Sequence, residues 1–303
     1  MRFGGLTYSP RSLMDQALGN IAVAERVIFG FGDRSLDLTE KVAVMGVLNV
    51  TPDSFFDGGR TCGLRAAVEH ARRLVEEGAD IVDVGGESTR PGAGSVPVDE
   101  EKARVLPVIR ELARDIPVPV SVDTRKAVVA SAALAAGAAI VNDVSALSHD
   151  PEMARVVAGE GAGVILMHMR GTPETMQLDP AYASVVDEVL EYLSERVDYA
   201  LSCGIDRARI AIDPGIGFGK TCEHNLEIIR RLDSFNELGI PVVIGPSRKS
   251  FIGEVLGLPV EKRLMGTAAA VALAVANGAR IIRVHDVGAM CQVVRVAEAI
   301  VEG

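Results

Sequence analysis

The sequence predicts a closed barrel of eight parallel β-strands alternating with helices, the (β/α)8 or TIM barrel. From Lys41 onward, eight short runs rich in β-branched residues alternate with longer segments of helical periodicity, which is typical of a parallel sheet. Polar residues gather where several of these runs end, and the active sites of TIM barrels lie at that end of the strands. A doubly wound open sheet remains the alternative, because the number of strands does not prove closure.

The predicted strands cover residues 42–50, 81–85, 118–122, 139–142, 163–167, 210–212, 242–244 and 281–284. Four of them follow a glycine that can adopt the left-handed conformation at the end of a helix, namely Gly78, Gly137, Gly161 and Gly278. Because strand side chains alternate, the third, fifth and seventh residues after each glycine share one face.

On this face, apolar residues give way to Asp83 after the first glycine and to Arg283 after the last. Counting from the third glycine in the same way predicts that Val164 and Leu166 also face the barrel interior. Polar residues therefore replace apolar ones only towards the C-terminal ends of the strands, the asymmetry expected of a TIM barrel.

Residues 1–37 are predicted to be an N-terminal extension, helical and docked on a barrel of residues 38–303. Apolar residues in this extension recur at the spacing of an amphipathic helix, at Leu13, Ala17, Ile21, Ala24 and Ile28. The first 17 residues match no pattern that suggests a role.

The composition excludes several classes of protein. The net charge is −10 and no cluster of five basic residues occurs, which argues against nucleic-acid or membrane-surface partners. The four cysteines are far apart and form no Cys-x-x-Cys pair, so we expect no zinc site and a reducing compartment, the cytoplasm. The longest apolar run, residues 268–276, is too short to cross a bilayer, and no secretory signal is evident.

Two loops after the first strands are candidate sites. Asn49 stands near the end of an otherwise apolar strand, where an amide needs partners, and the polar loop after it could close over a ligand. The loop after the second strand carries Arg90, whose planar guanidinium can bind phosphate or carboxylate. An ordinary turn with a satisfied Asn49, and a solvated surface Arg90, are the alternatives.

Polar residues also end the third, fourth and sixth strands. Asp123 ends the third, and Asn142 and Asp143 end the fourth, where either could instead be a satisfied polar residue of the barrel's upper layer. Asp213 precedes a glycine loop that finishes in Gly-Lys-Thr, but Pro214 occupies the first glycine position of a Walker A motif, so a P-loop does not fit. The glycines would instead let a planar ligand approach the backbone.

Cationic residues follow the last two strands. Lys249 is a candidate cation at the barrel mouth, and Ser250 with nearby amides could bind an anion. Arg283 and His285 share one face at the end of the last strand. Since this corner of TIM barrels frequently binds phosphate, the pair predicts a phosphate site, with a purely structural pair as the alternative.

At these residues the chain resembles the dihydropteroate synthases, folate-pathway enzymes of the pterin-binding TIM-barrel family. The resemblance runs from about Leu36 to the C-terminus, with matching blocks in the family's order at residues 49–55, 85–92, 121–124, 142–145, 166–168, 213–220, 247–250 and 283–285. It implies a transferase that joins 6-hydroxymethyl-7,8-dihydropterin diphosphate to p-aminobenzoate and releases pyrophosphate.

The resemblance also implies a role for each matching position. The pterin pocket would be lined by Asp123, Asn142, Met167, Asp213, Phe218 and Lys249. The diphosphate would be bound by Asn49, Thr89, Arg283 and His285, with Asn49 also holding a Mg²⁺ ion. The p-aminobenzoate site would be formed by Phe55, Thr89, Arg90, Pro91, Phe218 and Ser250. The residues expected to act in catalysis are Asp123, Lys249, Arg90 and Asp53.

The partners implied are the two small-molecule substrates and a second copy of the chain in a homodimer, with sulfonamides as inhibitors. A methyltransferase that acts on methyltetrahydrofolate is one rival, but it would need neither the Arg283–His285 pair nor Arg90. A catalytically silent relative that binds pterin or a protein partner is another, and it would be marked by lost motif residues. Departures from the family pattern are few: Phe56, Pro246 and Ala146, the last standing where glycine is usual.

Overall fold

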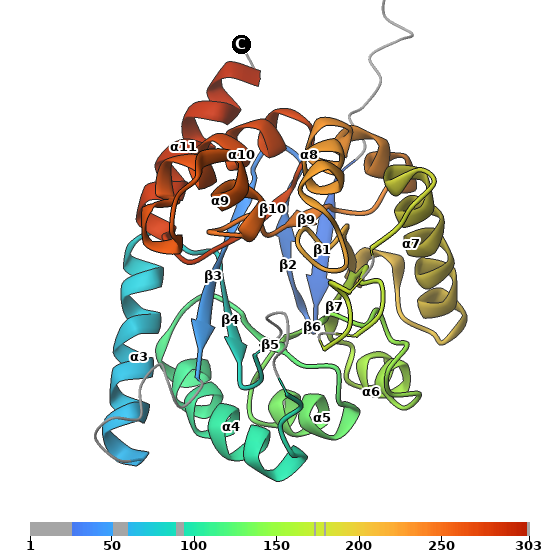
Figure 1. Ribbon diagram of the computed structural model, residues 1–303. Coiled ribbons are helices and arrows are strands. Elements are labelled where there is room, and N and C mark those ends of the chain that lie inside the picture. The colour runs from blue at the N-terminus through green and yellow to red at the C-terminus, as the bar shows by residue number, and fades with distance from the viewer. Residues whose placement is uncertain (1–25, 51–59, 89–93, 173, 179, 302–303) are drawn as a thin grey trace, which may run out of the picture.

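The chain forms a ring of eight parallel strands surrounded by helices (Figure 1), and the computed structural model describes residues 26–50, 60–88, 94–172, 174–178 and 180–301. The sheet order is β8-β7-β6-β5-β4-β3-β10-β9. The strands are β3 (Ala43–Asn49), β4 (Ile81–Gly85), β5 (Val120–Asp123), β6 (Ile140–Asp143), β7 (Gly163–Met167), β8 (Ile210–Asp213), β9 (Val243–Ile244) and β10 (Ile281–Val284). A parallel bridge between Ile212 and Val242 joins β8 to β9 and closes the ring, so the predicted TIM barrel is confirmed and the open sheet is wrong.

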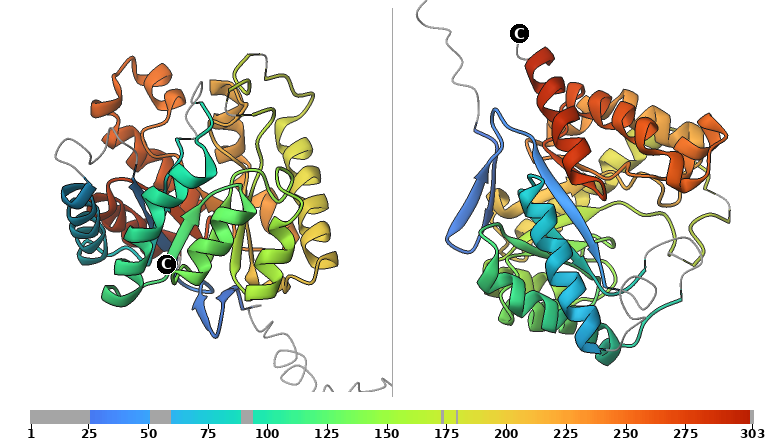
Figure 2. Two further views of the ribbon diagram at one scale, coloured as in Figure 1. Left: turned by 90° about the horizontal axis from the view of Figure 1, so that it is seen from below. Right: turned by 90° about the vertical axis from the view of Figure 1, so that its left-hand side faces the viewer.

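Helices cover the outside of this ring (Figure 2). They are α3 (Arg60–Glu76), α4 (Val98–Asp115), α5 (Ala127–Ala135), α6 (Met153–Glu160), α7 (Val185–Ser202), α8 (Cys222–Arg230), α9 (Ser250–Leu256), α10 (Leu264–Ala276) and α11 (Val287–Val301), with short 3-10 helices η1 (Arg207–Arg209), η2 (Leu232–Leu238) and η3 (Val260–Lys262). In α4, acidic residues in the first turn complement the helix dipole, and Val105, Ile109 and Leu112 recur at helical spacing and are buried.

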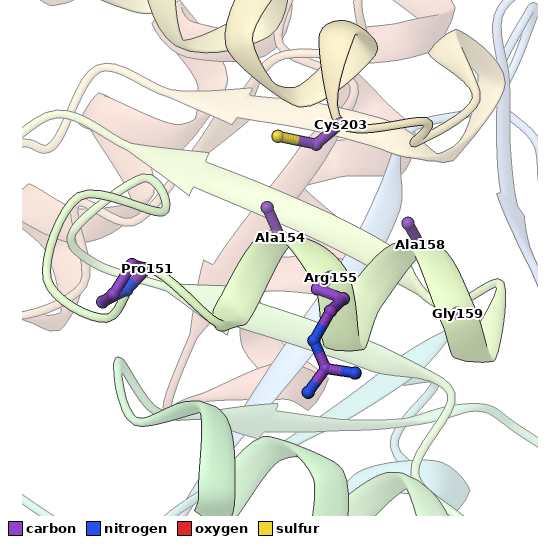
Figure 3. A pocket seen from close by; sticks show the side chains of 6 residues that line it. All are labelled: Pro151, Ala154, Arg155, Ala158, Gly159 and Cys203. Atoms are coloured by element: carbon purple, nitrogen blue, oxygen red, sulfur yellow. The ribbon is translucent and has the colours of Figure 1, made fainter.

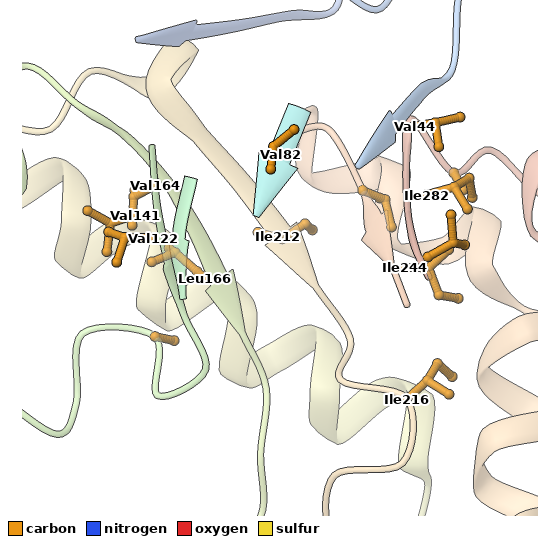
Figure 4. Packing of buried hydrophobic residues seen from close by; sticks show 14 of the residues in the cluster. Val44, Val82, Val122, Val141, Val164, Leu166, Ile212, Ile216, Ile244 and Ile282 are labelled. Atoms are coloured by element: carbon orange, nitrogen blue, oxygen red, sulfur yellow. The ribbon is translucent and has the colours of Figure 1, made fainter. Parts of the chain in front are cut away.

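The larger hydrophobic core lies between the strands and the helices. Figure 4 shows outward-facing residues of this core, among them Val44, Val82, Val122 and Ile282. Each such side chain contributes ~1.5–3 kcal/mol when it is fully buried. Since helices cover one face of the strands and the barrel interior the other, both faces are buried, which explains why the strand sequences are almost continuously apolar.

A β-hairpin covers the N-terminal end of the barrel. Its strands, β1 (Ile28–Phe31) and β2 (Arg34–Asp37), pair across a turn in which Gly32 has a φ of 57°. Phe29 and Phe31 are buried against the lowest interior residues of the barrel, including Met45 and Ile281.

The hairpin replaces the helix expected for this part of the extension. Side chains in Ile28–Phe31 alternate between half-buried and buried, which is the period of a strand. The rest of the predicted amphipathic helix lies almost wholly outside the described residues, so it and the domain division at residue 38 stay predictions.

Strand β7 differs from the expected pattern by one residue. Ile165, and not Val164 or Leu166, belongs to the interior cluster, while those two pack in the outer core. Gly163 starts the interior set because a Cβ at that position would lie 3.0 Å from the carbonyl oxygen of Gly30. The hairpin therefore leaves little room for a side chain at this interior position, which fits the observed phase of the strand.

In the described part of the chain, no helix is both long and apolar enough to span a membrane.

Candidate active site

Polar side chains form a layer inside the ring, directly above the apolar layer that the hairpin covers. Five strands contribute one interior side chain each to this layer: Asp83, Asp123, Asn142, Asp213 and Arg283. The three acids and the amide are buried, whereas the Arg283 side chain keeps 22% of its surface exposed. The alternation of strand side chains produces this arrangement. Each of these residues is the next inward-facing residue along its strand, towards the C-terminal end, after those that lie near the hairpin.

Arg283 connects the acids of this layer. Its Nε donates to Oδ2 of Asp83 at 2.7 Å, and its Nη2 donates to Oδ2 of Asp123 at 2.9 Å. Asn142 donates from Nδ2 to the same Asp83 oxygen at 3.1 Å. The predicted diphosphate ligand Arg283 is therefore also an ion-pair partner of two carboxylates, which the sequence did not indicate.

Burial changes the proton affinity of these groups. It raises the pKa of Asp123 to about 7, a rise that Arg283 opposes and Asp83 reinforces. Burial also raises the pKa of Asp213, against the opposing charge of Lys249. The pKa of Lys249 falls to about 8, mainly through burial and against the favourable charge of Asp213. Two acids and one lysine thus titrate closer to neutrality than usual, which is typical of functional sites.

Lys249 lies against the glycine loop that follows Asp213. Its ammonium donates to the carbonyl of Ile216 and lies 4.5 Å from the centre of the Phe218 ring. Gly217, with a φ of 81°, has the Lys249 stem so close that an added Cβ would lie 3.0 Å from Cδ. The glycine at this position therefore lets the lysine pass beside the backbone, whereas the predicted approach of a planar ligand to this loop stays a prediction.

A second buried pair, His168 and Lys220, fixes this loop from the other side. Lys220 Nζ lies 2.8 Å from His168 Nδ1 and donates to the Phe218 carbonyl at 3.1 Å. Burial lowers the pKa of His168 to about 2 and that of Lys220 well below its usual value. Gly215 packs so tightly that a Cβ there would lie 1.8 Å from the His168 carbonyl oxygen. The sequence places His168 and Lys220 in separate blocks that match the family and does not predict the contact between them.

Asp143 belongs to a turn and not to the barrel interior. Its carboxylate accepts hydrogen bonds from the Ser145 amide at 2.8 Å, the Ser145 hydroxyl at 2.6 Å and the Leu147 amide at 2.8 Å. Of the two neighbours left open by the sequence, Asn142 is therefore the one in the polar layer.

The remaining described candidates lie around the rim. Asn49, at the end of β3, is half-buried next to Gly85, whose added Cβ would lie 3.6 Å from both Asn49 Oδ1 and Asp123 Cβ. His285 Nδ1 lies 3.0 Å from the Ser247 hydroxyl. Met167 is buried at the end of β7, and Ser250 is exposed at the start of α9. The candidates Asp53, Phe55, Thr89, Arg90 and Pro91 lie outside the described residues, and their roles stay predictions.

The two ends of the segment that contains Arg90 are joined by charged residues. Glu87 accepts a hydrogen bond from the Val96 amide at 3.1 Å, and it pairs with Lys126. Lys126 also donates to the Val96 carbonyl at 2.6 Å and pairs with the buried Glu101 at 2.6 Å. This cluster sets where the segment leaves and rejoins the barrel.

The comparisons with known proteins decide the family. Residues 45–285 match the pterin binding enzyme family. The dihydropteroate synthase of Synechocystis sp. is 46% identical over 270 residues, which cover 89% of this chain and 93% of that protein. This chain belongs to the dihydropteroate synthase family. The resemblance inferred from the sequence blocks is thereby confirmed.

Solved structures of dihydropteroate synthases agree. The Xanthomonas albilineans enzyme with 4-aminobenzoic acid has a TM-score of 0.85 and 47% identity, over 91% of this chain and 98% of that one. The same enzyme in complex with 7,8-dihydropteroate has a TM-score of 0.81 and 44% identity, over 90% of this chain and 98% of that one.

A pocket of about 500 Å³ lies elsewhere on the dihydropteroate synthase fold, in the outer layer of helices (Figure 3). It is lined by Pro151, Ala154, Arg155, Ala158, Gly159 and Cys203. None of the candidate site residues borders it, so it is separate from the polar layer.

Proposed function

We propose that this chain condenses 6-hydroxymethyl-7,8-dihydropterin diphosphate with p-aminobenzoate to give 7,8-dihydropteroate and pyrophosphate. The arylamine nitrogen forms a bond to the pterin methylene carbon, the carbon–oxygen bond to the diphosphate breaks, and the amine loses a proton to solvent. The observation that carries the proposal is the buried polar layer in a member of this family. Apolar side chains would fill a barrel interior at lower cost than buried charges, so the layer points to ligand recognition.

The pterin is proposed to bind across Asp123, Asn142, Asp213 and Lys249. Adjacent N–H groups on the pterin edge suit a carboxylate, and its carbonyl oxygen suits the Lys249 ammonium. Asp213 accepts the Gly215 amide at 2.7 Å through Oδ1, which fixes the plane of its carboxylate. Phe218 lies beside Lys249 and would contact the bound ring.

The diphosphate is proposed to bind Arg283, His285 and Asn49. Of the Arg283 nitrogens, Nε and Nη2 are engaged by carboxylates, and Nη1 makes no hydrogen bond within the described residues. That nitrogen would donate to a phosphate oxygen while the carboxylates hold the guanidinium in place.

Magnesium fits this donor set. Mg²⁺ keeps several waters and is usually bound by one or two protein oxygens together with substrate phosphates, so the Asn49 amide oxygen suits it. Within the described residues, no three His, Cys, Asp or Glu side chains cluster into a metal cage. When bound, the ion would neutralise charge on the pyrophosphate as it leaves. Chelation should therefore weaken binding of the pterin diphosphate more than binding of a pterin without phosphate, and equal effects would remove the metal from this role.

Asp123 is proposed to assist departure of the leaving group. Loss of pyrophosphate develops positive charge on the methylene and the pterin ring, which an ionised carboxylate stabilises. Attack by the arylamine then depends mainly on its position. Sulfonamides share the arylamine ring of p-aminobenzoate and should compete with it, more strongly when pyrophosphate and Mg²⁺ are present.

A pyrophosphate-release assay with the pterin diphosphate, p-aminobenzoate and Mg²⁺ tests the function. Pyrophosphate and dihydropteroate should appear in equal amounts, and omitting p-aminobenzoate should abolish dihydropteroate. A folded chain that binds pterin but releases no pyrophosphate would instead be a catalytically silent relative.

We also propose that the chain forms a homodimer through α10 and α11. Helix α10 contains no charged residue, yet Met265 is 77% exposed and Leu273 is 57% exposed. On the neighbouring α11, Val296 is 61% exposed and Ile300 is 74% exposed. A second copy would bury this apolar surface. Light scattering should give twice the chain mass, Leu273→Glu should shift it towards one chain, and Val128→Glu on α5 should not. A wild type that is monomeric at high concentration would contradict the proposal.

The proposed location is the cytoplasm. The described cysteines Cys203, Cys222 and Cys291 are all free thiols, which suits a reducing compartment. Cell fractionation would test this.

A further inference from the structure

Asp83 is the one fully buried acid in the polar layer that no predicted role uses. It lies in the middle of β4, with Ile81 of the apolar layer one interior position below it. Within the described residues, both hydrogen bonds to the Asp83 carboxylate reach Oδ2, and Oδ1 has no partner. A buried carboxylate with an unsatisfied oxygen destabilises the fold compared with an apolar side chain of similar size. Stability alone does not account for an acid at this position.

The donors to Asp83 are two residues of the proposed substrate site. Asn142 donates its amide NH₂ to Asp83, so its carbonyl oxygen points away from Asp83. An asparagine amide is nearly symmetric in shape, and only its hydrogen bonds decide which end faces a ligand. Arg283 donates Nε to Asp83 and Nη2 to Asp123, so two acids fix the plane of one guanidinium. Asp83 therefore accepts from Asn142 and, together with Asp123, holds the Arg283 guanidinium.

We propose that Asp83 is a positioning residue, which orients Asn142 for the pterin and Arg283 for the diphosphate without touching either. The proposal rests on the proposed function, because it assigns Asp83 to the pterin diphosphate half of that site. Without the carboxylate, the Asn142 amide can rotate, and Arg283 keeps only Asp123 as a partner. Binding of the pterin diphosphate then loses two oriented contacts, while the p-aminobenzoate site loses none.

Asp83→Asn tests this with almost no change in volume. The asparagine can accept a hydrogen bond from one donor, but it carries no charge and presents an NH₂ group to the other. We expect KM for the pterin diphosphate to rise roughly tenfold to a hundredfold, the effect of losing one or two oriented hydrogen bonds to charged groups, with KM for p-aminobenzoate little changed.

Ser121→Ala is the matched control. Ser121 pairs with Asp83 in register on the adjacent strand β5, is fully buried, and has a hydroxyl without a partner in the described residues. Removing it disturbs the same interior layer but orients nothing, so both KM values should stay as in the wild type. An unchanged KM for the pterin diphosphate in Asp83→Asn, equal losses for both substrates, or the same loss in Ser121→Ala would each overturn the proposal.

Two further measurements keep the test independent of folding and of the function. If Asp83→Asn does not fold, the side-chain amide of Asn142 in the wild type can be followed by NMR, where slow hydrogen exchange is expected and exchange as fast as an exposed amide would overturn the proposal. In a double-mutant cycle, the effect of Asp83→Asn should shrink when Asn142 is already alanine, and full additivity would show that Asp83 acts elsewhere. Failure of the wild type to release pyrophosphate would overturn the proposed function, whereas an active wild type with an unaffected Asp83→Asn would overturn only this inference.

Discussion

The two ends of the barrel interior are made by the same strands but follow opposite rules. At the N-terminal end, Phe29 and Phe31 of the hairpin close an entirely apolar layer that includes Met45 and Ile281. At the C-terminal end, one interior position further along, Arg283 lies between two buried acids. The apolar layer at the N-terminal end stabilises the folded state, whereas the buried charges at the C-terminal end destabilise it and form the candidate site. Substitutions in the apolar layer should therefore change stability, and substitutions in the polar layer should change the kinetic constants.

Phe29→Ala should have the largest effect, and on stability alone. The side chain is completely buried in the lower layer, so its loss should lower the free energy of unfolding by ~3–5 kcal/mol. Chemical denaturation would measure this, with Ser35→Ala on the exposed side of the hairpin changing stability by no more than about 0.5 kcal/mol. A marked change in KM for either substrate, at a temperature where the variant is folded, would contradict the view that the apolar end affects stability alone.

Lys249→Ala should affect activity alone. Losing a charge-assisted hydrogen bond to the pterin costs ~1.5–3 kcal/mol, so kcat/KM should fall roughly tenfold to a hundredfold. The fold should remain, because the lysine contacts the glycine loop and not the hydrophobic core. Lys262→Ala, an exposed lysine of η3, is the control and should keep wild-type kinetics. Near-normal turnover in a folded Lys249→Ala variant would show that this lysine is only a surface residue without a role in the site.

The pH profile should sharpen the comparison at the polar end. With the pKa of Asp123 at about 7 and that of Lys249 at about 8, kcat/KM should rise as Asp123 ionises and fall as Lys249 loses its proton. Each limb should change about tenfold per pH unit. Lys249→Arg should remove the alkaline limb, because arginine stays protonated. A flat profile would remove both groups from the reaction.

The raised pKa of Asp123 also affects stability. The folded state binds this proton more tightly than the unfolded chain, so the contribution of Asp123 is present in acid and is lost as pH rises through about 7. Asp123→Asn should remove this part of the pH dependence.

The smallest expected effect concerns the turn after β6. Ala146 has a φ of 50°, in the left-handed region that costs a non-glycine residue ~1–2 kcal/mol. Ala146→Gly should relieve this strain, but glycine adds entropy to the unfolded chain and the buried methyl group of Ala146 is lost, so the net change in the free energy of unfolding should lie within ~0.5 kcal/mol of zero. The control Ala132→Gly, inside α5, should instead destabilise by ~1 kcal/mol. If Ala146→Gly were as destabilising as Ala132→Gly, the left-handed conformation of Ala146 would not be a source of strain.

The ring of strands could be predicted from the sequence, because the pattern that indicates it lies within each strand segment. Alternation in each strand together with a polar residue at its end was enough to bring Asp123, Asn142, Asp213 and Arg283 to one end. The hairpin was missed because its strands are only four residues long and their apolar side chains are buried by the barrel, not by each other. The phase of β7 was missed for the same reason, since a carbonyl of that hairpin leaves little room for a side chain at Gly163.

The partners of the charged residues could not be predicted. Asp83 has the same sequence signature as any polar residue within a strand, and only the closure of the ring brings Arg283 on β10 against it. Lys220 likewise meets His168, which lies 52 positions earlier in the chain, beyond the ends of two neighbouring strands. Such contacts depend on the radius and stagger of the barrel, which no single segment encodes.

The closure of the ring is uneven, and a pterin bound as proposed would therefore also stabilise the closed ring. β9 is only two residues long, so it pairs briefly with both of its neighbours, and it meets β8 through the single bridge between Ile212 and Val242. The other neighbouring strands of the ring pair over longer stretches. Asp213 stands on one side of this seam and Lys249 follows on the other. A pterin that binds both residues is a crosslink across the weakest part of the ring, so its binding free energy also resists opening of the barrel, by RT ln(1 + [L]/Kd).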